Sequence, residues 1–188
     1  MKSLVERARV GDRTAFEKLL DLFHEEIFRM VYYRTRSFED SEDLTQEIFV
    51  QAYRKVSKLQ DPCRFRPWLF AIAVNRVRDF YRKKGLFAFL RTSAGTDELE
   101  ESKGAVSQHD GPVDRLMRQE LWEKIDSVLG RLSRLDREVF TLRFMDHLTI
   151  REICQVLGKS ESAVKTHLYR ALHKLRREST LLEFSQED

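Results

Sequence analysis

Two groups of polar side chains in this chain have the residue types that bind nucleic acid. The first belongs to the basic segment 160–177, where hydroxyl-bearing and cationic side chains gather on one side of an expected helix: Ser162, Lys165, Thr166, Tyr169 and Arg170. Hydroxyl and amine groups read base edges in the major groove, and cations contact phosphates. The chemistry that these residues predict is non-covalent recognition of duplex DNA.

The second group lies in segment 63–91, which carries eight basic side chains against the single carboxylate of Asp79. Aromatic residues are interleaved with these cations: Phe65, Trp68, Phe70, Phe80 and Tyr81. This combination suits single-stranded nucleic acid, because phosphates meet the cations while unstacked bases find ring surfaces. Asn75, Asp79 and Arg82 fall on one polar face of an expected helix. For Phe65 and Trp68, burial in a core is an equally good interpretation.

Three local signals position the first group. Thr149 and Glu152 have the spacing of a capping box at a helix start, and an apolar stripe follows: Ile150, Ile153, Cys154 and Leu157. Gly158 tolerates the positive φ of a helix stop, and Ser160 is a suitable N-cap for the next helix. The pattern predicts a helix-turn-helix whose second helix enters the major groove.

The second helix of this motif has an inward row of apolar residues: Val164, Leu168, Ala171, Leu172 and Leu175. His167 and His173 are expected on its solvated surface. The alternative is an ordinary αα-hairpin with a solvated basic face. The coincidence of the glycine spacing, the capping box and the basic face favours the DNA-reading motif.

A helical unit between residues 3 and 85 is expected to position the second group. Asp12 can cap a helix whose apolar positions follow a helical period from Phe16 to Val31, and a loop at 37–40 precedes a third helix. The third helix has an inward apolar row: Leu44, Ile48, Ala52 and Val56. Its opposite face is acidic and polar: Glu42, Asp43, Gln46, Glu47 and Gln51. Pro67 suits the first position of a fourth helix. The apolar segment 86–90 would either extend this helix or dock on a partner.

Composition favours a nearly all-α protein. Of 188 residues, 41% are hydrophobic and 35% charged, with only 7 Gly and 3 Pro, too few for a turn-rich β fold. A second unit is expected from residue 113, with helices at 116–129 and 136–145. Residues 92–114 carry six carboxylates against Lys103. Acids and glycines here predict a flexible acidic linker at 92–112 between the two small domains.

Several classes of protein are excluded. No apolar run approaches the length of a membrane span, and the N-terminal residues are charged throughout, unlike a secretory signal. Cys63 and Cys154 are far apart and form neither a disulfide framework nor a metal pattern. We expect a cytoplasmic protein with reduced thiols, no metal ion and no cofactor.

Long segments of the chain resemble bacterial RNA polymerase sigma factors. EDLTQEIFVQAY at 42–53 and FRPWLFAIAVNRVRDFYRKK at 65–84 are similar to sigma domain 2, and segment 132–178 is similar to sigma domain 4. With no domain between them, the chain resembles the extracytoplasmic-function (ECF) sigma factors. The resemblance implies domain 2 at 1–91, the linker at 92–112 and domain 4 at 113–188.

The resemblance also implies partners and site residues. The chain would bind core RNA polymerase and start transcription at selected promoters, without enzymatic activity or a small-molecule substrate. The β′ clamp helices would contact the third helix at Asp43, Gln46, Glu47 and Gln51, and the β flap would be a further contact. The melted −10 strand would meet Arg64, Phe65, Trp68, Asn75, Arg78 and Arg82. The −35 duplex would meet Ser162, Lys165, Thr166, Tyr169 and Arg170.

The resemblance further implies an anti-sigma factor that restrains the protein and is able to hold it at the membrane. The loop LQDPCRFRP at 59–67 departs from the family in being short and in containing Pro and Cys. In this family the loop sets −10 specificity, so the preferred base stays open.

Three other classes of protein compete with this interpretation. A stand-alone helix-turn-helix regulator would bind duplex DNA tightly without polymerase. An enzyme acting on nucleic acid would need Glu42, Asp43 and Glu47 as a metal cluster, but no His or further carboxylate is spaced to complete that site. A sequestering or adaptor protein would leave the basic recognition helix unexplained.

Overall fold

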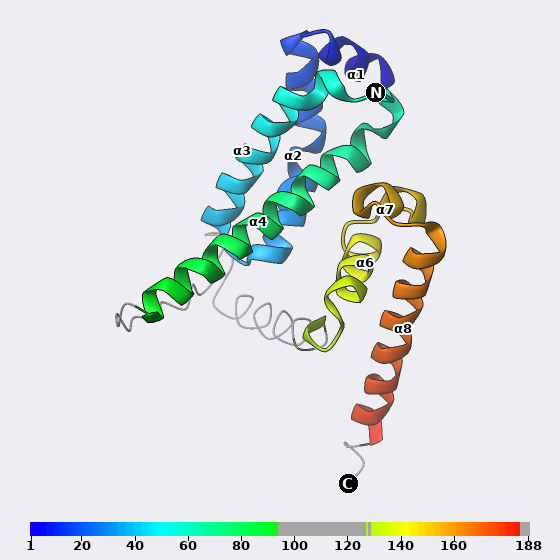
Figure 1. Ribbon diagram of the computed structural model, residues 1–188. Coiled ribbons are helices and arrows are strands. Elements are labelled where there is room, and N and C mark those ends of the chain that lie inside the picture. Colours follow the sequence, from blue (N-terminus) through cyan, green and yellow to red (C-terminus); the bar gives the residue numbers. More distant parts are fainter. Residues whose placement is uncertain (94–126, 128, 185–188) are drawn as a thin grey trace, which may run out of the picture. The chain divides into compact units, whose positions relative to one another are not determined.

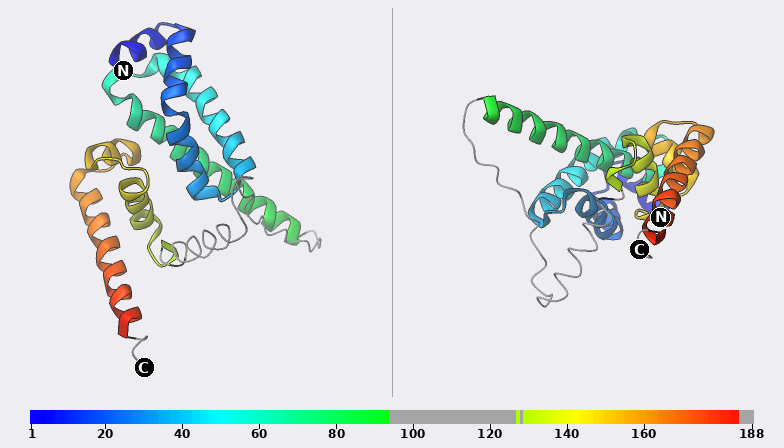
Figure 2. Two further views of the ribbon diagram at one scale, coloured as in Figure 1. Left: turned by 180° about the vertical axis from the view of Figure 1, so that it is seen from behind. Right: turned by 90° about the horizontal axis from the view of Figure 1, so that it is seen from below.

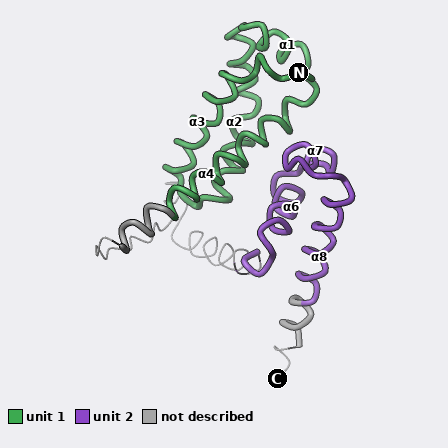
Figure 3. Tube along the Cα trace, viewed as in Figure 1, with its two compact units in different colours: residues 1–107 green, residues 108–188 purple. Residues whose placement is uncertain are grey.

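The computed structural model describes residues 1–93, 127 and 129–184, and the described residues form helices joined by turns, without strands. The chain divides into two compact units, residues 1–107 and 108–188 (Figures 1 and 3). The all-α, two-domain prediction is confirmed. Most of the predicted linker at 92–112 and of the helix predicted at 116–129 lies outside the described residues.

The first unit contains four α-helices: α1 (Lys2–Arg9), α2 (Arg13–Thr35), α3 (Phe38–Lys55) and α4 (Phe65–Ser93). Two short 3-10 turns, Val56–Lys58 and Pro62–Arg64, connect α3 to α4. Helix α2 packs against α1 and α3, and α4 lies across both α2 and α3 (Figures 1 and 2). Each long helix therefore presents one face to a shared core and one face to solvent.

The core of the first unit comes from apolar residues at helical spacing. Among its largest fully buried side chains, α2 contributes Leu19, Ile27 and Met30, and α3 contributes Ile48. Helix α4 contributes Phe65, Leu69 and Phe70. The inward row predicted for the third helix is confirmed, because Leu44, Ile48, Ala52 and Val56 are all buried. Replacing one such Leu or Ile by Ala costs about 2–5 kcal/mol in a typical core.

Side-chain caps begin α2 and α3, and the second cap corrects the loop predicted at 37–40. Asp12 accepts a hydrogen bond from the Ala15 amide at 3.0 Å, as predicted. Ser37 caps α3 by accepting from the Asp40 amide at 3.2 Å, so residues 38–40 are already helical. The turn is this short because Arg36 takes a left-handed conformation, with φ of 58°, and ends α2 within one residue.

The start of α4 is also earlier than predicted. The helix begins at Phe65, directly after the 3-10 turn, so Pro67 is its third residue. Proline is tolerated there because the first-turn amides have no partner within the helix. At the other end, the backbone stays helical to Ser93. Segment 86–90 therefore extends α4, which answers the question that its apolar sequence left open.

The second unit contains α6 (Arg134–Phe144), α7 (Ile150–Leu157) and α8 (Glu161–Phe184). Ser133 caps α6, which begins two residues before the predicted Asp136. The predicted capping box at Thr149 is present in full, Gly158 ends α7 with φ of 62°, and Ser160 accepts from the Ala163 amide at 3.3 Å. The helix-turn-helix is confirmed as a local structure.

The inward row of α8 needs one correction. Val164 and Ala171 are buried, and Leu168 and Leu175 are half-buried. Leu172 is 44% exposed instead of facing inward. Its position, one residue beyond the buried Ala171, turns it about 100° out of the contact with α6. In the described part of the chain, no helix is both long enough and apolar enough to cross a membrane.

The turn at Gly158 provides a test of the helix-turn-helix. Gly158→Ala should lower the free energy of unfolding of the second unit by about 1–2 kcal/mol, because a Cβ disfavours the left-handed conformation. No other atom lies within 4 Å of the added Cβ, so the cost is conformational. Gly158→Asn should cost less, since Asn tolerates this region.

Urea unfolding of the full chain, followed by circular dichroism, measures these differences. The matched control is Gly130→Ala, at an exposed helical glycine that also has open space around its Cβ. Ala there should be neutral or stabilising. Equal losses at both glycines would contradict the left-handed turn as the reason.

Candidate nucleic-acid interface

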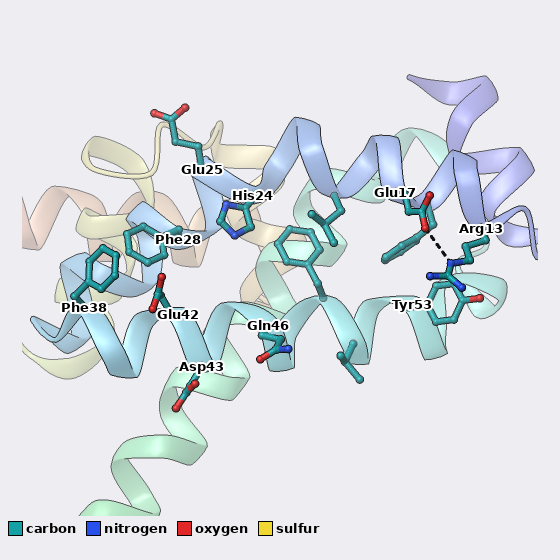
Figure 4. A pocket seen from close by; sticks show the side chains of 14 residues that line it. Arg13, Glu17, His24, Glu25, Phe28, Phe38, Glu42, Asp43, Gln46 and Tyr53 are labelled. Atoms are coloured by element: carbon teal, nitrogen blue, oxygen red, sulfur yellow. Dashed lines mark hydrogen bonds and ion pairs between the residues drawn. The ribbon is translucent and has the colours of Figure 1, made fainter.

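The acidic face of α3 is solvent-accessible, as the sequence predicts. Asp43, Gln46 and Glu47 are exposed, whereas Gln51 is half-buried. Asp43 and Gln46 form part of one wall of a groove of about 960 Å³ between α2 and α3 (Figure 4). Two of the four predicted polymerase contacts, Asp43 and Gln46, therefore border a concave surface, whereas Glu47 and Gln51 lie outside its lining.

The groove is apolar within and acidic around it. Its apolar lining includes Phe28, Phe38, Phe49, Val50 and Tyr53. The carboxylates among the lining residues, Glu17, Glu25, Glu42 and Asp43, outnumber its single arginine, Arg13. Arg13 pairs with Glu17 at 2.9 Å (Figure 4). Such a surface suits a partner helix with apolar residues flanked by cations.

An ion pair connects two surfaces that the sequence analysis treated separately. Glu47, predicted to contact polymerase, pairs with Arg76 of α4, the helix predicted to contact the −10 strand. The Glu47 side chain is 52% exposed and that of Arg76 is 27% exposed. The charge of Glu47 is therefore shared within the protein, whereas Asp43 makes no ion pair within the part of the chain that the structure describes. Sequence reasoning missed this pair, because the two residues are far apart in the chain.

The polar face of α4 follows the predicted pattern. Asn75 and Arg82 are exposed and Arg78 is half-buried. Arg82 pairs with Asp79 at 3.1 Å, one helical turn earlier. Tyr81 donates a hydrogen bond to the backbone carbonyl of Arg34 at the end of α2. This bond ties the middle of α4 to the first unit, so its polar face is held in a defined orientation.

Phe65 corrects the list of predicted DNA contacts. Its side chain is completely buried, with ring centroids 5.4 Å from Phe23 and 5.6 Å from Trp68. We therefore assign Phe65 to the core, because no ring face is left for a base. Trp68 is half-buried and keeps part of its surface accessible. Phe65 and Trp68 lie in the first turn of α4, where too few residues precede them to show which side of the helix faces the core. The spacing of apolar residues therefore could not tell which of the two aromatic side chains is buried.

The loop before α4 is held by its own polar contacts. Asp61 accepts a hydrogen bond from the Cys63 amide at 2.9 Å and pairs with Arg64 Nε at 3.2 Å. Arg66 points to α2, where its Nη2 lies 2.5 Å from Glu26 Oε1. Arg66 therefore belongs to the internal packing of the unit, whereas Arg64 remains exposed beside it.

The predicted −35 contacts all lie on the exposed surface of α8: Ser162, Lys165, Thr166, Tyr169 and Arg170. Tyr169 is 69% exposed. Thr166 donates its hydroxyl to the Ser162 carbonyl at 2.9 Å, and Lys165 pairs with Glu161 at 2.6 Å. The structure thus brings this set together on one accessible helix face.

His167 is not at a solvated surface, contrary to the prediction. Its Nδ1 lies 2.8 Å from Asp136 Oδ1, which joins α8 to the first turn of α6. Burial of Asp136 opposes ionisation, but hydrogen bonds from Ser133 and His167 outweigh it and hold the pKa of this carboxyl below its usual value. No local spacing in the sequence reveals the pair. Its effect is to fix the recognition helix against the rest of its unit.

The described residues contain no cluster of three or more His, Cys, Asp or Glu side chains able to hold a metal ion. Cys63 is exposed and Cys154 is half-buried, and both are free thiols.

Two family models match separate regions of this chain. The model of sigma-70 region 2 matches residues 19–87, and that of sigma-70, region 4 matches residues 122–175. The ECF RNA polymerase sigma factor BldN of Streptomyces coelicolor is 35% identical over 94% of this chain, which spans 65% of the length of BldN. The ECF RNA polymerase sigma factor SigW of Bacillus subtilis is 28% identical, over 95% of this chain and 96% of SigW.

The RNA polymerase sigma factor CnrH of Cupriavidus metallidurans is 32% identical over 79% of this chain and 76% of CnrH. The solved structure of CnrH in complex with the cytosolic domain of CnrY matches with a TM-score of 0.68 and 27% identity, covering 97% of this chain and 96% of CnrH. Sequence and fold agree, and the chain belongs to the sigma-70 family, as an RNA polymerase sigma factor of the ECF group.

Proposed function

We propose that this protein binds core RNA polymerase and directs initiation at promoters whose −35 duplex is read by α8 and whose melted −10 strand is held by α4. The observation that carries the proposal is the presence of two exposed basic and polar surfaces of different character on two compact units. The hydroxyl and cationic face of α8 suits duplex DNA, whereas the arginines and the partly exposed Trp68 at α4 suit an opened strand.

At the −35 element, the first half of α8 enters the major groove, as in other helix-turn-helix proteins. Lys165, Thr166 and Arg170 supply donors to bases and phosphates, and the Asp136–His167 contact supports the helix from behind. Because phosphate contacts release counterions, promoter binding should weaken steeply as salt rises.

At the −10 element, unstacked bases are held by the loop 61–66 and the exposed face of α4. Each base that gains stacking and pocket contacts contributes about 1–3 kcal/mol towards keeping the strands open. Arg64, Asn75, Arg78 and Arg82 meet the bases or phosphates, and Trp68 shapes the surface. The protein makes or breaks no covalent bond and needs no cofactor.

Polymerase docks on α3 through the β′ clamp helices, and the second unit meets the β flap. The groove beside Asp43 and Gln46 receives apolar side chains of the clamp, while the surrounding carboxylates attract its cations. We assign domain 2 to residues 1–91 and domain 4 to residues 113–188. The acidic linker at 92–112 occupies the basic nucleic-acid channel of polymerase.

An anti-sigma factor is the second partner. The structure of the relative CnrH contains the cytosolic domain of CnrY, and we extend this kind of regulation to the present chain. The protein would act in the cytoplasm, where polymerase transcribes, and the anti-sigma factor would hold it away from polymerase until induction.

The contacts of α3 predict an order of importance for polymerase binding. Asp43→Asn should weaken the affinity for core polymerase by roughly two- to fivefold at low salt. Glu47→Gln should weaken it less, because Arg76 already shares the charge of Glu47. Fluorescence titration of the labelled full chain with core polymerase measures both affinities.

The control for this titration is Glu6→Gln, which removes a carboxylate from the exposed Lys2–Glu6 pair on α1. Its affinity should equal that of the wild type. If Glu47→Gln lowers the affinity for core polymerase as much as Asp43→Asn does, the explanation that Arg76 shares the charge of Glu47 is contradicted.

The face of α8 is tested by Lys165→Ala and Arg170→Ala in transcription with core polymerase. Each should weaken −35 recognition by about 1–3 kcal/mol if the side chain contacts a base. Paired templates with and without the −35 element separate this effect from a loss of folding, because the variants should differ from wild type only on the first template. Lys18→Ala, an exposed cation on α2, is the control. Unchanged transcription from the −35-dependent template would reject these assignments.

A further inference from the structure

Glu26 of α2 and Arg66 of α4 form a partly buried ion pair between two helices of the first unit. Both Nε and Nη2 of Arg66 reach Glu26 Oε1, at 3.1 and 2.5 Å, and Nε also lies 3.4 Å from Oε2. The two side chains are only 22% and 24% exposed. Partial burial reduces screening by water and salt, so this pair is stronger than an exposed one.

Aromatic packing fixes the same arginine from a second direction. The Arg66 guanidinium lies 5.2 Å from the centre of the Phe70 ring, one helical turn further along α4. The preceding residue, Phe65, is buried between Phe23 and Trp68. The first turn of α4 is therefore bound to α2 through both a charge pair and a stack of rings.

The loop ahead of this turn depends on that attachment. Leu59 is buried at its beginning and Phe65 at its end. Between them, Asp61 makes contacts only within the loop, to Cys63 and Arg64. The internal contacts give the loop its shape, and the turn Pro62–Arg64 also packs against α1. Phe65 and Arg66 join the end of the loop to α2 and place it beside Trp68.

We propose that Glu26 is a positioning residue for −10 recognition, which acts through Arg66 to hold the loop 61–64 and Trp68 in the arrangement that selects one unstacked base. The inference rests on the proposed function and extends it to a residue of α2 that lies outside the basic segment. Selection between bases needs groups held to a fraction of an ångström, and a two-pronged guanidinium contact provides such geometry.

The required geometry distinguishes this role from simple charge neutralisation. Lysine in place of Arg66 would keep the positive charge, but it would lose the two-pronged contact with Glu26 and the stacking on Phe70. A role in charge alone predicts that Arg66→Lys behaves as wild type. A positioning role predicts that Arg66→Lys and Glu26→Gln share the same defect.

The experiment measures initiation by the full chain with core polymerase on four templates that differ only in the base at the selected −10 position. The readout is the ratio between the preferred base and the others. Glu26→Gln and Arg66→Lys should each lower that ratio by roughly fivefold or more. The exchanged pair, Glu26→Arg with Arg66→Glu, should recover part of it. Glu6→Gln is the control and should keep the wild-type ratio.

Thermal unfolding of each variant reports whether the first unit stays folded, and the ratio separates positioning from stability. A purely structural role would lower initiation equally on all four templates and leave the ratio unchanged, which would overturn the inference. Wild-type protein without promoter-specific initiation would instead reject the proposed function. If the wild-type protein selects one base and both variants select it equally well, only the role of Glu26 is rejected.

Discussion

The packing of α4 across α2 and α3 is the constraint on which the rest of the first unit depends. Leu69 and Phe70 of α4 are completely buried in the same core as Ile27 and Ile48. Because one face of each of these helices is buried in the core, the opposite face is exposed to solvent. The acidic face of α3 and the polar face of α4 are thus held at a fixed separation, which is what the proposed function requires of a small unit with two partners.

Charge pairing within the unit decides which side chains remain available to partners. Arg66 is paired with Glu26 and Arg76 with Glu47, so both belong to the scaffold although they lie in the strongly basic segment. Arg64 and Arg82 also pair with carboxylates, but locally and at the surface, where exchange with a phosphate costs little. Under the proposed function, recognition of the strand would therefore depend on the placement of a few cations more than on net charge.

Local signals in the sequence predicted local structure well. The caps at Asp12 and Thr149 and the left-handed turn at Gly158 are set by neighbouring residues, so short spacing is sufficient to find them. The contacts Glu26–Arg66, Glu47–Arg76 and Asp136–His167 join residues 29 to 40 positions apart. They follow from tertiary packing, which no spacing rule encodes. For the same reason the sequence left burial in the core and contact with DNA equally open for Phe65, which the structure buries.

The most direct test of the central claim is run-off transcription with the full chain, core RNA polymerase and a genomic promoter library. The account predicts initiation at a limited set of promoters that share −35 and −10 sequences, well above the level with core polymerase alone. Initiation no different from core alone, or tight duplex binding that polymerase does not change, would contradict it.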